Sequence, residues 1–328
     1  MILTLALPGG LIPQQPDAGA VGALGSSGFR RLQLSAQDPG RAYREADLAS
    51  WIDTGNEAQL EIVLSVSTLL DKRIIDTTNC VVEGLKSGVT RVVPHRICPF
   101  HGNTERISDV LGRVVAQAIS AGTEPTIHLS YFRFENVHQC LAPACLAKFS
   151  ERVGHFIQRP DLDDSVYLEW LAWRQESMAS TLRTLQQNAG IGSFGRAKTS
   201  IEVDFDHLKR YLVGPEIEEG LSVDHVVPEV DEAYLHVEAS DIVAKSPHGN
   251  LRLSYEESYV HLLRYANSRV RKYGASPHLF FWNLASPRTL KGNLERHLEL
   301  ARLSAPSGVV LYSPLWSELC RETRRRSS

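Results

Sequence analysis

The chain has 328 residues, of which 43% are hydrophobic and 22% are charged, so it is long enough to bury a core as one large domain or two small ones. Its formal net charge is -3 at pH 7, and its lysines and arginines are dispersed except in the C-terminal segment RETRRRSS, so no surface for nucleic acid is predicted. No apolar run is long enough to cross a bilayer, which predicts a protein that does not enter a membrane.

The N-terminal segment MILTLALPGG is apolar but short, lacks a basic leader and runs directly into turn residues. It is therefore predicted to be a first strand and not a signal peptide. The five cysteines form an odd set in a long chain, which argues against a secreted disulfide framework. The predicted location is the cytoplasm.

Short apolar runs alternate with longer amphipathic stretches along the chain, a pattern typical of βαβ units around a parallel sheet. Eight runs are predicted to be strands, at residues 2–7, 29–35, 60–67, 126–132, 199–205, 232–238, 278–284 and 308–314. This pattern predicts an α/β protein that is a single (β/α)8 TIM barrel over residues 1–318, with its last strand closing against its first. Residues 319–328 are predicted to be a frayed basic tail.

The clearest helix is predicted between the fourth and fifth strands, from Tyr167 to about Asn188. Its apolar positions recur at helical spacing, and Gly190 ends it; the residues expected to face the barrel are Leu171, Met178, Leu182 and Leu185. A second helix is predicted over 103–122. The segments after the third and fourth strands, 68–102 and 135–165, are unusually long, and catalytic residues of barrels lie on loops of this kind.

Four segments share their order with a known family: CPFHGNTERISDVLGRVVAQAI, IHLSYFRFENVHQCLAPACLAKF, YLEWLAWRQESMASTLRTL and FDHLKRYLVGPEIEEGLSVDHVVPEVDEAYLHVEAS. Together they cover roughly residues 90 to 240. They resemble uncharacterised bacterial TIM-barrel proteins regarded as hypothetical glycoside hydrolases, which are relatives of the amylase-like barrels. In this chain Ser130 stands where that family's strand carries an aspartate, and Pro215 stands where the family has a glutamine. The resemblance implies a carbohydrate or glycoside as substrate.

Carboxylates on two neighbouring predicted strands are the candidate catalytic groups. Glu202 and Asp204 alternate with apolar residues and so share one strand face, roughly 6.5 Å apart along the backbone. Glu238 shares a face of the next strand with His236 and Tyr234. Facing carboxyl groups with separated pKa values are what a glycosidase needs. The alternatives are that one carboxylate is solvated or caps a helix, and that His236 is a hydrogen-bonded interior residue.

The remaining candidate residues are predicted to bind substrate at the barrel mouth. His128 and Ser130 share the inner face of the fourth strand, and Arg133 and Glu135 follow at its rim, where they could equally form a structural ion pair. Aromatic rings can stack on sugars or simply fill the core, and an amide can bind a hydroxyl; the candidates are Tyr131, Trp282, Tyr312 and Asn283.

Neither a metal nor a cofactor is predicted. The spacing of Cys140 and Cys145 offers no second cysteine pair to complete a tetrahedral zinc site, even with His101 and His138 nearby. The G-x-G-x-x-G pattern at 190–195 follows a helix and precedes a strand, the reverse of a dinucleotide-binding turn. The alternatives to a hydrolase are a catalytically degenerate barrel that binds a glycan or a protein partner, and a lyase or isomerase that uses His128 or His236 as a base.

Overall fold

The structure is a computed structural model that describes residues 1–7, 15–38, 41–42, 45–70, 77–85, 87–101, 104–204, 221–238, 249–282 and 298–312. The predicted site residue Asn283, Pro215 and the tail 319–328 lie outside these residues. The backbone of Asp204, Glu238 and Trp282 is described, but their side chains lie outside the description.

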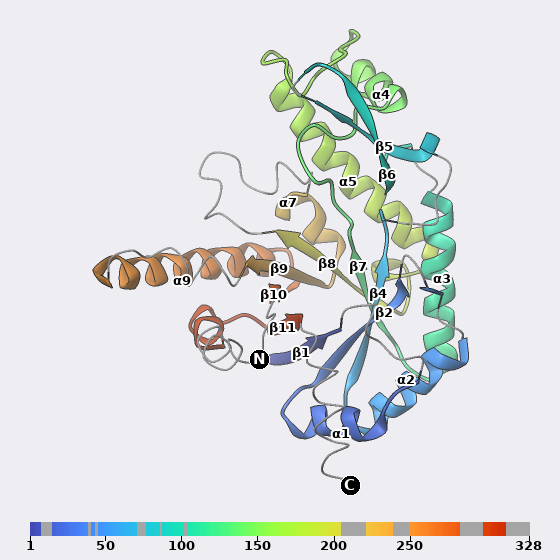
Figure 1. Cartoon of the computed structure of the whole chain (residues 1–328), viewed down its shortest axis with the longest axis vertical. Helices are drawn as coiled ribbons and strands as arrows, with labels where there is room; N and C mark the ends of the chain where they lie inside the picture. Colours follow the sequence, from blue (N-terminus) through green and yellow to red (C-terminus); the bar gives the residue numbers. More distant parts are fainter. Residues whose placement is uncertain are drawn as a thin grey trace.

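The core of the fold is a closed barrel of eight parallel strands, as the sequence predicts (Figure 1). The strands are β1 (Ile2–Ala6), β2 (Arg31–Asp38), β4 (Glu61–Ser67), β7 (Thr126–Ser130), β8 (Lys198–Asp204), β9 (Glu232–Glu238), β10 (Ser276–Trp282) and β11 (Gly308–Tyr312). The predicted closure is confirmed, because β1 pairs in parallel with β11 from Ile2↔Gly308 to Ala6↔Tyr312. On its other side β1 pairs with β2. The two-residue strand β3 (Arg41–Ala42) adds an antiparallel edge to β2.

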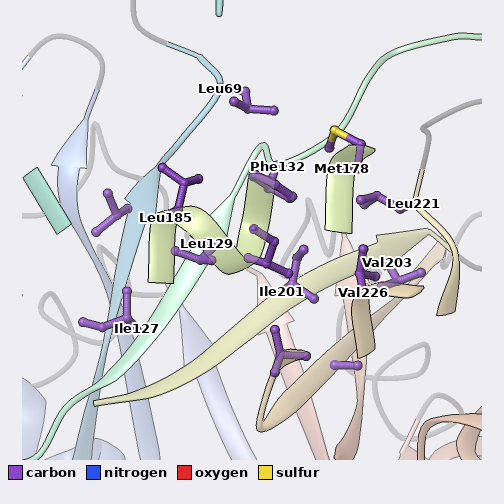
Figure 2. Packing of buried hydrophobic residues seen from close by; sticks show 14 of the residues in the cluster. Leu69, Ile127, Leu129, Phe132, Met178, Leu185, Ile201, Val203, Leu221 and Val226 are labelled. Carbon is purple, nitrogen blue, oxygen red and sulfur yellow. The ribbon is translucent and has the colours of Figure 1, made fainter. Parts of the chain in front are cut away.

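Helices cover the outside of the barrel. The described helices are α1 (Ala18–Ser26), α2 (Glu45–Glu57), α3 (Thr104–Ser120), α4 (Pro143–Val153), α5 (Tyr167–Ala189), α7 (Val223–Val226) and α9 (Gly249–Lys272), with 3-10 turns at Thr77–Asn79, Gly192–Phe194 and Val227–Glu229. None of the described helices is both long enough and apolar enough to cross a membrane. Figure 2 shows Met178 and Leu185 of α5 in the same buried cluster as Leu129 of β7 and Ile201 of β8.

The helix α5 confirms the predicted face. Leu171, Met178, Leu182 and Leu185 are buried, whereas the side chains at 183 and 187 are exposed. The helix ends where Gly190 takes the left-handed conformation at φ 65°, from which its backbone N–H reaches the carbonyls of the last turn. Complete burial of one leucine side chain contributes about 1.5–3 kcal/mol, so this stripe fixes the helix on the barrel wall.

The two long loops form a small layer at one end of the barrel (Figure 1). The loop after β4 contains the antiparallel hairpin of β5 (Cys80–Gly84) and β6 (Thr90–Ile97), and the loop after β7 contains α4. Backbone hydrogen bonds join the two loops: Gly84 N–H donates to His138 O at 3.0 Å, and Leu141 N–H donates to Val82 O at 2.7 Å. We refer to residues 77–101 and 131–157 together as the loop layer.

The barrel interior separates into an apolar centre and polar ends. Ala6, Tyr234, Phe280 and Val310 pack together inside the barrel, apart from the large cluster between sheet and helices. Buried polar side chains on the described strands surround this centre: Thr4, Arg31, Gln33, Ser65, Thr126, His128, Ser200, Glu232 and His278. The interior is therefore packed and is not a pore.

Candidate active site at the mouth of the barrel

Strand register brings the predicted catalytic positions to one edge of the barrel. The strands β8 and β9 are neighbours, with Glu202 opposite Tyr234 and Asp204 opposite His236. The strand β10 lies beside β9, with Glu238 opposite Trp282. Asp204 and Glu238 are the last residues of β8 and β9, so both carboxylate positions lie where barrel enzymes place catalytic residues.

His128 is a buried interior residue and not a group at the surface of the mouth. It is 1% exposed, its Nδ1 lies 3.0 Å from Ser200 Oγ, and its ring stacks on that of Tyr234 with centroids 4.6 Å apart. Burial lowers the pKa of His128 to about 4, and the negative charge of Glu202 opposes this shift only in part. The imidazole is therefore neutral at pH 7. It packs inside the barrel against β8, the strand that carries half-buried Glu202.

A row of rings leads from this histidine to the open end of the barrel. Tyr234 stacks on Phe280 with centroids 6.4 Å apart, and Phe280 contacts His236 at 5.6 Å and Tyr312 at 6.1 Å. Tyr234 is completely buried, whereas His236 and Tyr312 are half-buried. His236 and Tyr312 are thus the described members of this row that a ligand in the mouth can reach.

The rim beyond β7 brings Glu135 together with a residue of the other long loop. Glu135 forms an ion pair with Arg96 of the hairpin. The guanidinium of Arg96 also lies over the ring of Tyr131, 5.7 Å from its centroid. Tyr131 is 36% exposed and has a left-handed backbone with φ 57°. Arg133 is half-buried. No signal in the sequence identifies Arg96, because its partners lie in a different loop.

A second charged cluster lies at the opposite end of the barrel. The Arg31 guanidinium donates two hydrogen bonds to the Glu232 carboxylate at 2.8 Å and one to Glu61 at 2.7 Å. His278 Nε2 lies 3.6 Å from Glu232. Burial raises the pKa of Glu232, while the charge of Arg31 opposes the shift. Because this cluster lies at the amino ends of the strands, we infer that it stabilises the fold.

The structure also assembles a cluster of cysteines that sequence spacing does not reveal. Cys98 and His101 of one long loop meet Cys140 and Cys145 of the other, and the four potential ligand atoms lie within 4.8 Å of one another. Cys98 is the ligand that the spacing argument lacked. His138 is not part of the cluster; it pairs with Asp161, the two atoms being 2.7 Å apart. These residues could hold a metal ion.

The barrel is similar in fold to solved structures. No family model matches the sequence, and no curated protein matches it either. Among solved structures, the glycoside hydrolase domain of PgaB (BpsB) from Bordetella bronchiseptica is similar over 99% of this chain and 97% of that one, with a TM-score of 0.71 and 13% identity. α-L-fucosidase isoenzyme 2 from Paenibacillus thiaminolyticus is similar over 100% of this chain and 49% of its own, with a TM-score of 0.58 and 10% identity. At these identities the similarity establishes the barrel fold.

Proposed function

We propose that the protein is a carbohydrate-active enzyme that hydrolyses a glycoside at the mouth of the barrel. The observation that supports the proposal is the placement of Glu202, Asp204 and Glu238 near the carboxyl ends of two neighbouring strands. The full-length similarity to a domain named as a glycoside hydrolase favours the same chemistry. We also propose a cytoplasmic location, on the ground of the odd number of cysteines in the sequence.

The proposed mechanism uses two carboxyl groups. One, in its protonated form, gives its proton to the glycosidic oxygen as the bond to the sugar breaks. If the two lie about 5 Å apart, the other, ionised, attacks the anomeric carbon, and water then hydrolyses the resulting glycosyl–enzyme ester with the first group acting as base. If they lie about 6.5–9.5 Å apart, the ionised group activates a water molecule that attacks the anomeric carbon directly. We assign Glu238 as one of these two groups and either Glu202 or Asp204 as the other.

The substrate is held, in this proposal, by the rings and polar groups around the mouth. Exposed Tyr131 and half-buried Tyr312 offer flat faces for the C–H surface of a sugar ring. His236 and Arg133 are half-buried and offer hydrogen bonds to hydroxyl groups. Ser130 is also half-buried, and its carbonyl accepts hydrogen bonds from the backbone and hydroxyl of Thr68, which fixes the end of β7.

Ser130 favours a second candidate function, a degenerate barrel that binds a glycan without cleaving it. The resembling family carries an aspartate at this strand position, and a serine cannot act as its acid. The lyase or isomerase alternative rests on His236 as its base, because His128 is 1% exposed and does not meet a substrate carbonyl without rearrangement.

The test is a panel of glycosides assayed for released sugar between acid and neutral pH, with binding of each glycan measured by calorimetry. Release of sugar that falls with Glu202→Gln or Glu238→Gln supports hydrolysis. Glu229→Gln is a control carboxylate, because Glu229 lies outside the strands and pairs with Arg183. Binding of a glycan without release across the panel would replace the hydrolase by the degenerate barrel.

A further inference from the structure

The cysteine cluster joins the two halves of the loop layer. Cys98 and His101 follow β6, whereas Cys140 precedes α4 and Cys145 lies in its first turn. The hairpin and the segment 138–141 form a continuous backbone ladder, with a bridge between Glu83 and Gln139. Pairing of the two loops therefore brings the four side chains together, although 41 residues lie between Cys98 and Cys140 in the sequence.

The distances within the cluster fit a tetrahedral metal ion better than a disulfide. Cys98 Sγ lies 3.4 Å from Cys145 Sγ, and His101 Nδ1 lies 3.2 Å from Cys145 Sγ. Sulfur atoms bound to one Zn²⁺ at about 2.3 Å in tetrahedral geometry lie about 3.8 Å from one another. A disulfide needs about 2.05 Å. The 3.4 Å between the two sulfur atoms is close to the distance expected around zinc, and all four potential ligand atoms lie within 4.8 Å of one another.

The surroundings of the sulfur atoms suit thiolates. All three cysteines of the cluster are completely buried. Phe100 N–H donates to Cys98 Sγ at 3.4 Å, and Val82 N–H donates to Cys140 Sγ at 3.3 Å. Backbone donors of this kind stabilise and orient metal-bound sulfur. Buried thiolates without a cation would be costly, so the donors point to a positive charge among them.

We propose that Cys98, His101, Cys140 and Cys145 bind one Zn²⁺ as a structural site that holds the loop layer together. Three cysteines and one histidine are a ligand set that zinc prefers over harder cations, and four protein ligands leave no open position for catalysis. Binding releases the thiol protons as the three metal–sulfur bonds form. The site thereby fixes the loops that carry Arg96, Tyr131 and Glu135 to the rim.

The direct test is the zinc content of the full-length protein, produced with zinc in the medium, desalted and measured by elemental analysis. We expect about one zinc per chain for the native sequence. Cys98→Ser and Cys145→Ser should lose most of it. Cys80→Ala is the matched control, because Cys80 is a buried thiol of the same hairpin outside the cluster, and it should keep the metal.

Cobalt separates a metal site from a failure of the variants to fold. Native protein freed of zinc by a chelator and then given Co²⁺ should show thiolate-to-metal charge-transfer absorption and the intense visible bands of tetrahedral coordination. Added Zn²⁺ should abolish these bands and raise the melting temperature. Native protein that holds no zinc after loading and gives no thiolate–cobalt bands would overturn the proposal. So would a disulfide between Cys98 and Cys145 in freshly purified protein, shown by mass spectrometry without reductant.

Discussion

The substitution Arg31→Met removes the cation from the charged cluster at the amino end of the barrel. The side chains of Arg31 and Glu232 are 5% and 7% exposed, whereas that of Glu61 is 40% exposed and keeps contact with water. The variant therefore leaves one buried carboxylate, that of Glu232, without its partner. Removing one member of a buried ion pair costs about 3–5 kcal/mol, so we expect that loss in the free energy of unfolding at pH 7.

The loss should depend on pH, because the groups facing Glu232 determine its protonation. Burial already raises the pKa of Glu232, and removal of Arg31 takes away the charge that opposes the shift. A carboxyl with a raised pKa in the folded state stabilises the fold below its unfolded value of about 4.3, and this stabilisation is lost as the pH rises through the folded value. His278, which also faces Glu232, has its pKa lowered to about 3 by burial and by Arg31, and its protonation in the variant would act in the same direction.

Urea unfolding followed by fluorescence, at pH 7 and near pH 4, measures both effects as the difference between variant and native protein. The difference should be about 3–5 kcal/mol at pH 7 and smaller near pH 4. The double variant Arg31→Met with Glu232→Leu removes both charges and should be close to native in stability at pH 7. Equal stability of Arg31→Met and native protein at pH 7 would refute this reasoning, as would a loss independent of pH.

Three further predictions concern α5, the interior histidine and the rim. Leu182→Asp should abolish soluble expression, because it buries an unpaired charge at a cost of several kcal/mol. The control Asn188→Asp, on the exposed face, should express normally. Normal yield and melting temperature for Leu182→Asp would show that another face is buried. Because the pKa of His128 is lowered, its contribution to the free energy of unfolding is complete above about pH 6.5 and is lost as the pH falls toward about 4. Urea unfolding over this pH range should therefore show a shallower fall in stability for His128→Gln than for the native protein. Glu135→Gln should lower turnover of a cleaved glycoside less than Glu238→Gln does, because Glu135 pairs with Arg96 at the rim; equal losses would give Glu135 a catalytic role.

The barrel could be predicted because its determinants are local. Each parallel strand is a segment of five to eight residues in which apolar residues run together or alternate with polar ones. Strand order follows once consecutive βαβ units wind in one direction. The buried face of α5 follows from helical spacing alone. The hairpin of β5 and β6 gives a weaker signal, because much of β6 is exposed and its residues do not alternate regularly.

Side-chain contacts between distant segments could not be predicted. The partners Arg31 and Glu232 are 201 residues apart, and a strand glutamate gives no indication of which arginine it will meet across a barrel. The pairing of Arg96 with Glu135, and of Cys98 with Cys145, depends on how two long loops pack on each other. A spacing rule applied to one segment at a time therefore finds Cys140 and Cys145 and misses Cys98, which comes from the other loop.

The most direct test of the proposed function is the initial rate of sugar release by Glu238→Gln, compared with the native protein on the glycoside that the native protein cleaves best. The variant keeps the shape and hydrogen bonding of the side chain and removes only its titrating group. Our account predicts a rate lower by roughly 100-fold or more, with the melting temperature unchanged. An unchanged rate would contradict the assignment of the strand-end carboxylate as the catalytic group.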